Sequence, residues 1–222
     1  MAAHPVQAGE DRGERAVLTV TSTPEVAWFR PPADDAGTLN ACYNALDIHV
    51  IRGRADEIAF TDPDGDLTFA RLLTEVAACA GVLRAFGIGL GDRVAVVDVP
   101  RVTGVVVTLA AARVGAVSVY DDPPVADATM VVRPGADGVV LAADGEELPW
   151  DVARRAGRTD PAGCTDVPGD AVLSRHGDRT LSVLAALGAS EEPAPAPPEG
   201  ATRVEVGGLT IWSFAPREHV RT

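Results

Sequence analysis

The residues that could bind a phosphate group lie in the segment Asp170–Ser182 (DAVLSRHGDRTLS), directly after its short apolar run AVL (171–173). Ser174, Gly177 and Thr180 combine two hydroxyl groups with a glycine, which lets backbone N–H groups approach an anion closely. Two interpretations stay open, a decayed phosphate loop and an ordinary surface turn. Asp178 would add negative charge where a triphosphate must sit.

A second group of candidates, Asp98, Tyr120 and Asp121, follows two apolar stretches that predict strands. Open α/β sheets bind ligands at the carboxyl ends of their strands, so a crevice here could take a small acid, a nucleotide or an acyl group. The alternatives are that Asp98 caps the helix starting near Arg101 and that Asp121 belongs to a polar loop. The sequence shows no Ser-His-Asp arrangement and no metal-ligand spacing, so we predict neither a catalytic residue nor a metal site.

Composition narrows the classes of partner. The 222 residues carry a formal charge of −13, which disfavours nucleic acid because phosphate binding needs a basic surface. Three cysteines without a CxxC pair indicate reduced thiols in a cytoplasmic protein. We expect no signal peptide, because the first 15 residues contain no apolar run. The longest apolar run, 102–119, contains Arg113 and predicts a buried helix and strand rather than a membrane span. Abundant Ala, Val, Arg and Gly with no Lys point to a bacterial source.

A strand, a helix and a strand position the candidates at the sheet edge. A near-continuous apolar strand over Arg93–Val99, a helix over Val102–Gly115 and a strand over Ala116–Tyr120 predict a parallel, right-handed βαβ unit. Apolar residues spaced by three and four predict a helix over Phe69–Phe86, with Thr68 as its N-cap.

The remaining pattern divides the chain into four parts. We expect a disordered tail (1–15), an α/β domain (16–190), a stiff Pro-rich linker (191–200), and a β-hairpin with a tail (201–222). The hairpin turns at Gly207-Gly208 and places four apolar side chains on one face, those of Val204, Val206, Leu209 and Ile211. Further expected strands are 16–23, 129–132, 138–142 and a hairpin around 62–66, and further helices are 39–49, 146–156 and 179–187.

Three stretches resemble one enzyme family: LNACYNALDIHV (39–50), LTFARLLTEVAACAGVLRAFGIGLGDRVAV (67–96) and LAAARVGAVSVY (109–120), with Trp28-Phe29 upstream. They are similar to the acetyl-CoA and propionyl-CoA synthetase branch of the AMP-forming acyl-CoA synthetases. The resemblance implies a partial N-terminal domain of that family, with a parallel sheet flanked by helices.

The motifs with which this family binds ATP and CoA have no match in the chain. The family holds ATP on a Ser/Thr-Gly-Thr-Thr-Gly core followed by Pro-Lys-Gly, and no segment of this chain fits it or the family's later motifs. Where the family has a Phe-Gly-Gly turn near CoA, this chain has Tyr120-Asp121-Asp122, whose carboxylates would repel phosphates.

We therefore expect a degenerate, non-catalytic homologue that needs no cofactor and binds a protein partner or a second copy of itself. The alternative is a residual or split AMP-forming ligase for a small carboxylic acid, using ATP or AMP and CoA. We expect the hairpin over Arg203–Phe214 to cover the apolar face that a partial domain exposes.

Overall fold

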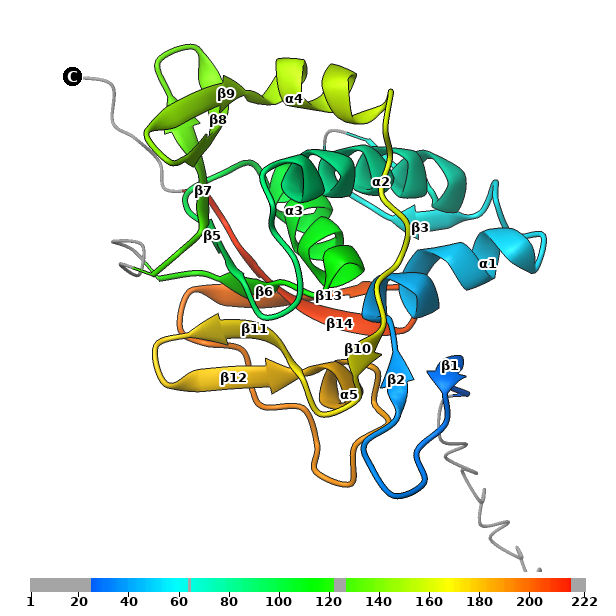
Figure 1. Ribbon diagram of the computed structural model, residues 1–222. Helices are drawn as coiled ribbons and strands as arrows, with labels where there is room; N and C mark the ends of the chain where they lie inside the picture. Colours follow the sequence, from blue (N-terminus) through cyan, green and yellow to red (C-terminus); the bar gives the residue numbers. More distant parts are fainter. Residues whose placement is uncertain (1–24, 64, 122–126, 217–222) are drawn as a thin grey trace, which may run out of the picture.

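The computed structural model describes residues 25–63, 65–121 and 127–216, and its centre is a seven-stranded sheet (Figure 1). The strand order is β12-β11-β6-β5-β7-β8-β9. The four strands β11, β6, β5 and β7 run parallel, whereas β12 pairs antiparallel with β11, β8 with β7, and β9 with β8. The predicted α/β class with a parallel sheet is confirmed. The bounds are β5 (Arg93–Val96), β6 (Val117–Val119), β7 (Met130–Gly135), β8 (Gly138–Ala143), β9 (Glu146–Pro149), β11 (Val172–His176) and β12 (Arg179–Ser182).

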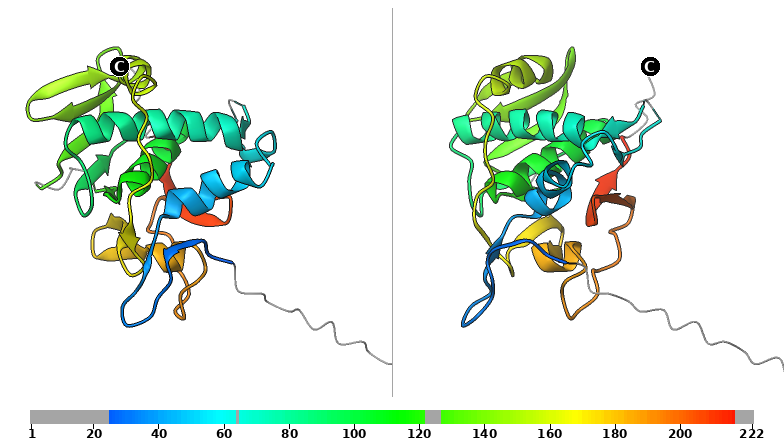
Figure 2. Two further views of the ribbon diagram at one scale, coloured as in Figure 1. Left: turned by 45° about the vertical axis from the view of Figure 1, so that its right-hand side comes forward. Right: turned by 90° about the vertical axis from the view of Figure 1, so that its right-hand side faces the viewer.

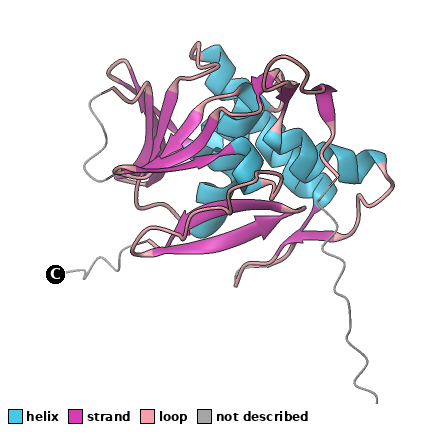
Figure 3. Ribbon diagram, turned by 90° about the horizontal axis from the view of Figure 1, so that it is seen from below, coloured by secondary structure: helices cyan, strands magenta, loops and turns pink. Residues whose placement is uncertain are grey.

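The helices form a layer beside this sheet (Figure 3). Helix α2 (Phe69–Ala85) packs on α3 (Arg101–Val114), and α4 (Trp150–Gly157) packs on α2. The Thr68 hydroxyl accepts a hydrogen bond from the Arg71 backbone N–H at the start of α2, as predicted. Helix α3 ends where Gly115 takes a φ of 80°, which a glycine adopts at little cost. The βαβ unit β5–α3–β6 is confirmed.

Two predicted helices begin later than expected. Residues 146–149 form β9 before α4, and residues 179–182 form β12 before the short helix α5 (Val183–Ala186). In both places the residues directly after a tight turn form a hairpin strand before the helix begins. Asp144 and Gly145 have φ values of 51° and 81°, and Gly177 has 55°, so each turn sends the chain back as a hairpin strand.

The amino-terminal part surrounds the helices. Strands β1 (Trp28–Arg30), β2 (Thr38–Leu39) and β10 (Val167–Pro168) form a small sheet, so Leu39 lies in a strand and not in the predicted helix. The helical segment that follows contains a π-helical turn, η1 (Tyr43–Asp47), and α1 (Ile48–Ile51). Strands β3 (Ile58–Phe60) and β4 (Leu67–Thr68) form the predicted hairpin.

The carboxy-terminal hairpin is confirmed in position, turn and register. Strands β13 (Ala201–Val206) and β14 (Leu209–Phe214) pair around Gly207 and Gly208, whose φ values are 54° and 87°. The four side chains predicted to share a face are all buried. They join the core that contains α3, and Figure 2 shows the hairpin beside the helical segment η1–α1. The hairpin therefore covers α3.

The Pro-rich segment 191–200 lies against the domain. Arg179 Nη1 donates hydrogen bonds to the carbonyl oxygens of Ala196 and Pro197, and Arg203 Nη2 to that of Pro195. The expected tail over 1–15 and strand over 16–23 lie outside the described residues. None of the described helices is long and apolar enough to cross a membrane.

Candidate functional site

Asp98 and Tyr120 lie at the same edge of the sheet. They follow β5 and β6, which run parallel, so both belong to the carboxyl edge where the sequence predicted a crevice. Asp98 has a φ of 53°, a conformation that few residues other than glycine adopt. The N-cap position of α3 is occupied by Pro100 rather than by Asp98.

Tyr120 is part of a buried group of hydroxyls. Its phenol oxygen lies 2.7 Å from Thr108 Oγ1 in a hydrogen bond, and its side chain is 7% exposed. Ser118 and Ser174 face each other across β6 and β11 and are fully buried. Within the described residues their hydroxyl oxygens have no hydrogen-bond partner of good geometry, although both lie close to the phenol. Burial raises the pKa of Tyr120 despite these neighbours, so the phenol stays protonated.

The end of β14 closes the crevice. The Phe214 ring lies 5.1 Å from the Tyr120 ring and 5.1 Å from the His176 ring, centroid to centroid. Trp212, Ser213 and Phe214 line the remaining cavity together with Asp98 and Tyr120. Its volume is about 20 Å³, which is room for one water molecule. The part of the predicted crevice beside Tyr120 is therefore filled by the chain's own hairpin, whereas a more open hollow of about 300 Å³ borders Asp98 and is lined by Pro100, Pro134 and Val139.

The segment predicted as a phosphate loop or a surface turn is a β-hairpin. Ser174 lies on β11, Thr180 lies on β12, and Gly177 and Asp178 form the turn between them. Ser174 pairs with Leu181, whereas Thr180 pairs with Arg175. Because side chains alternate along a strand, Ser174 and Thr180 point to opposite faces, the first buried and the second exposed. The two hydroxyls do not converge on one ligand.

A carboxylate already occupies the backbone donor of this turn. Asp121 Oδ1 accepts a hydrogen bond of 2.6 Å from the Gly177 N–H and lies 3.6 Å from His176 Nδ1. The fold thus brings together one residue from each predicted group, the crevice residue Asp121 and the loop residue Gly177. Their contact places a negative charge where a bound phosphate would need to lie.

The sequence reading missed a buried ion pair between Asp47 and Arg113. Two hydrogen bonds of 2.7 and 3.0 Å join the side chains, and Arg113 Nε donates to the Ala162 carbonyl. Burial lowers the pKa of Arg113, but the bond to Asp47 outweighs it and the net pKa is raised. The neighbouring Asn40 amide donates to the carbonyls of Ala112 and Arg113 at the end of α3. The signal that could have revealed this pair is the lone arginine within an apolar helical stretch, because a buried guanidinium needs a counter-charge.

These contacts give Asp47 and Asn40 a structural role. Together they connect the helical segment η1–α1 to α3 through side chains that lie far apart in the sequence.

In the part of the chain that the structure describes, no group of three or more His, Cys, Asp or Glu side chains could hold a metal ion.

Comparison with known proteins agrees with this fold. The family model for AMP-binding enzymes matches residues 48–171, more than half of the chain. Acetyl-coenzyme A synthetase of Burkholderia thailandensis is 42% identical over 104 residues, and that of Burkholderia mallei is 40% identical over 105. Each alignment covers 45% of this chain and 15% of the relative, so the chain spans a small part of these relatives. The crystal structure of an anthranilate CoA ligase with anthranoyl-AMP has a TM-score of 0.52 at 13% identity, covering 68% of this chain and 36% of that one.

Proposed function

The chain belongs to the AMP-binding enzyme family, and we propose that it is a non-catalytic member, similar to acyl-CoA synthetases, that acts by binding a protein. One observation carries the proposal, the closure of the strand-end crevice by β14. The cavity beside Tyr120 has about 20 Å³, compared with roughly 300–1,000 Å³ in typical small-molecule sites. The open hollow on the other side of Asp98 has about 300 Å³, but none of its described lining residues is cationic and could hold a phosphate. An acyl adenylate does not fit without displacement of the buried Trp212 and of Phe214.

The charge distribution supports the same proposal. Asp121 already accepts the hydrogen bond of the Gly177 N–H, so this donor is not available to a bound anion. The chain also carries a net charge of −13, which disfavours anionic ligands. We therefore propose that the protein works without ATP, AMP or CoA. Its partner would be a protein with a basic surface, or a second copy of the chain joined through uncharged surface, and neither nucleic acid nor a membrane. Free cysteines and the bacterial relatives support a cytoplasmic location in a bacterium.

Acid-dependent exchange of pyrophosphate into ATP tests the proposal directly. The purified chain is assayed with short carboxylic acids, with a heat-denatured sample as the background control. Exchange at background level for every acid is the expected result. Exchange above background would refute the non-catalytic assignment, because it requires an adenylate to form and reverse. Affinity purification at two salt concentrations then tests for a basic partner, and light scattering tests for a dimer.

A residual or split AMP-forming ligase is the second candidate, and the buried hydroxyls of Ser118 and Ser174 favour it. Fully buried hydroxyls without a well-placed partner are costly in a core and are typical of polar sites. In this case the protein would bind a small carboxylic acid, a nucleotide or an acyl group, with ATP or AMP and CoA as its cofactors. Ser174→Ala would then weaken nucleotide binding, and Thr180→Ala, on the exposed face, provides the matched control.

A further inference from the structure

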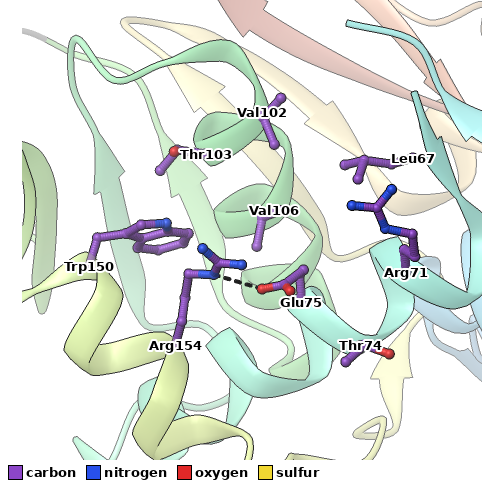
Figure 4. A pocket seen from close by; sticks show the side chains of 9 residues that line it. All are labelled: Leu67, Arg71, Thr74, Glu75, Val102, Thr103, Val106, Trp150 and Arg154. Atoms are coloured by element: carbon purple, nitrogen blue, oxygen red, sulfur yellow. Dashed lines mark hydrogen bonds and ion pairs between the residues drawn. The ribbon is translucent and has the colours of Figure 1, made fainter. Parts of the chain in front are cut away.

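A second hollow lies on the helix side of the sheet, away from the closed crevice (Figure 4). It is formed where α2, α3 and α4 meet and has a volume of about 250 Å³. We name it the Arg71–Trp150 pocket. The side chains that matter for its chemistry are three charged ones from α2 and α4 and three apolar ones from α3 and α4: Arg71, Glu75, Arg154, Val102, Val106 and Trp150.

The pocket carries surplus positive charge. Glu75 accepts hydrogen bonds of 2.7 Å from Arg154 Nε and 2.5 Å from Arg158 Nη2, so one carboxylate faces two guanidinium groups. Arg71 stands across the hollow from Arg154 (Figure 4), and within the described residues its guanidinium makes neither a hydrogen bond nor an ion pair. The pocket lining therefore has two arginines against one glutamate, and Glu75 is also paired with Arg158 outside the lining, so the pocket has a local positive excess in a chain with a net charge of −13.

The remaining wall of the pocket is apolar. Val106 is buried and Val102 half-buried on α3, and the half-buried Trp150 ring stands beside them at the start of α4. Hydrocarbon placed against these side chains leaves water, while an anionic group on the same molecule reaches a guanidinium. A mostly apolar wall with a few charged groups that fix orientation is the usual construction of a small-molecule site.

Size decides between possible anions. A volume of about 250 Å³ lies just below the roughly 300–1,000 Å³ of typical small-molecule sites, so the pocket suits a ligand smaller than a nucleotide or CoA. Inorganic phosphate would leave the Val102, Val106 and Trp150 surfaces uncovered. A guanidinium group pairs with a carboxylate through two parallel hydrogen bonds, so a carboxylate suits Arg71.

We propose that the Arg71–Trp150 pocket binds a small organic monocarboxylate with an aromatic or branched hydrocarbon body. The carboxylate pairs with Arg71 on the positive side of the pocket. The hydrocarbon body lies between Trp150 and the two valines. This site is separate from the strand-end crevice, so it does not depend on the absence of catalysis.

Titration of the full chain with benzoate, followed by ligand-observed NMR, tests the proposal. We expect saturable binding, at least tenfold weaker binding of the neutral isostere benzamide, and at least tenfold weaker benzoate binding by Arg71→Gln. Arg71→Gln keeps the N-cap of α2, because the Thr68 hydroxyl accepts its hydrogen bond from the backbone N–H at position 71, not from the Arg71 side chain. Arg155→Gln is the matched control, since Arg155 pairs with Asp151 on the exposed side of α4 and lies outside the pocket.

The outcomes separate cleanly. Absence of saturable benzoate binding by the folded wild-type chain would overturn the proposal. Equal affinity for benzamide would overturn the role of charge, and equal affinity of Arg71→Gln would place the binding elsewhere. A Trp150→Ala variant that keeps full affinity would refute the apolar half of the site. Competition by inorganic phosphate as strong as by benzoate would show a general anion site instead.

Discussion

Removal of the Asp47 carboxylate should destabilise the whole domain. Arg113 has a side chain that is 8% exposed, and Asp47 is the carboxylate that pairs with it, through two hydrogen bonds. Asp47→Ala leaves a buried guanidinium without its counter-charge. The Ala162 carbonyl remains as an acceptor and satisfies one of its donors.

The structure sets the size of the effect. Breaking a buried ion pair by removing one partner costs about 3–5 kcal/mol. The Asp47 side chain is 17% exposed, and Arg113 keeps its bonds to the Ala162 carbonyl and to Cys42 Sγ, so we expect the lower end, about 3 kcal/mol. A domain of this size loses roughly 2–4 °C in melting temperature for each kcal/mol, so the melting temperature should fall by about 6–12 °C.

Urea denaturation and thermal melting of Asp47→Ala, Arg113→Met and the double variant measure this coupling. The double variant should be clearly more stable than the sum of the two single losses predicts, because it leaves no unpaired charge. Asp151→Ala, which breaks an exposed pair on α4, is the control and should hardly change the melting temperature. A loss below about 1 kcal/mol in Asp47→Ala would refute the reasoning.

Three further predictions concern the hairpin, a surface ion cluster and a buried thiol. Gly207→Ala should destabilise the fold by about 2–4 kcal/mol in urea unfolding, because a Cβ would lie 2.1 Å from the Ala45 carbonyl oxygen at a φ of 54°. Gly208→Ala, with open space around it, should cost less. Burial raises the pKa of Glu75, but hydrogen bonds from its two arginines outweigh it and hold the pKa below the ordinary value. Its contribution to stability is therefore present above its unfolded pKa and is lost as the pH falls through the folded value, so Glu75→Gln should flatten the acid limb of the stability curve. Burial raises the pKa of Cys79 to about 12, so iodoacetamide at pH 8 should leave this thiol unlabelled until the chain is unfolded.

Each of these predictions has an opposing result. Equal stability of the two glycine variants would contradict the close approach of the hairpin to η1. A Glu75→Gln variant that loses stability in acid as steeply as the wild type would contradict the pKa assignment. Labelling of Cys79 in the native state would show that α2 is not packed as described.

The parts of the fold that sequence predicted well rest on local patterns. The helix over α2 follows from apolar spacing and the Thr68 cap, and the last hairpin follows from Gly207-Gly208 between alternating side chains. Strands β9 and β12 were missed because the residues that follow the short turns at Asp144-Gly145 and Gly177-Asp178 were assigned to helices, whereas they pair back as hairpin strands.

The candidate site was harder to predict because its decisive contacts are long-range. Asp121 and Gly177 are 56 positions apart in the sequence. Neither residue type indicates by itself that the Asp121 carboxylate accepts a hydrogen bond from the Gly177 backbone N–H. Phe214 reaches Tyr120 from the far end of the chain. The sequence placed Ser174 and Thr180 in one loop, whereas strand alternation separates their side chains onto two faces.

The position of the hairpin in the chain has a consequence for biosynthesis. Helix α3 ends at Val114, but the hairpin strands that cover it are completed at Phe214, 100 residues later. At roughly 5–20 residues per second, the ribosome needs about 5–20 s to make that stretch. During this time the apolar side of α3 awaits its cover, which makes the nascent chain a substrate for chaperones. A stalled or prematurely released chain would expose that surface permanently and would tend to aggregate.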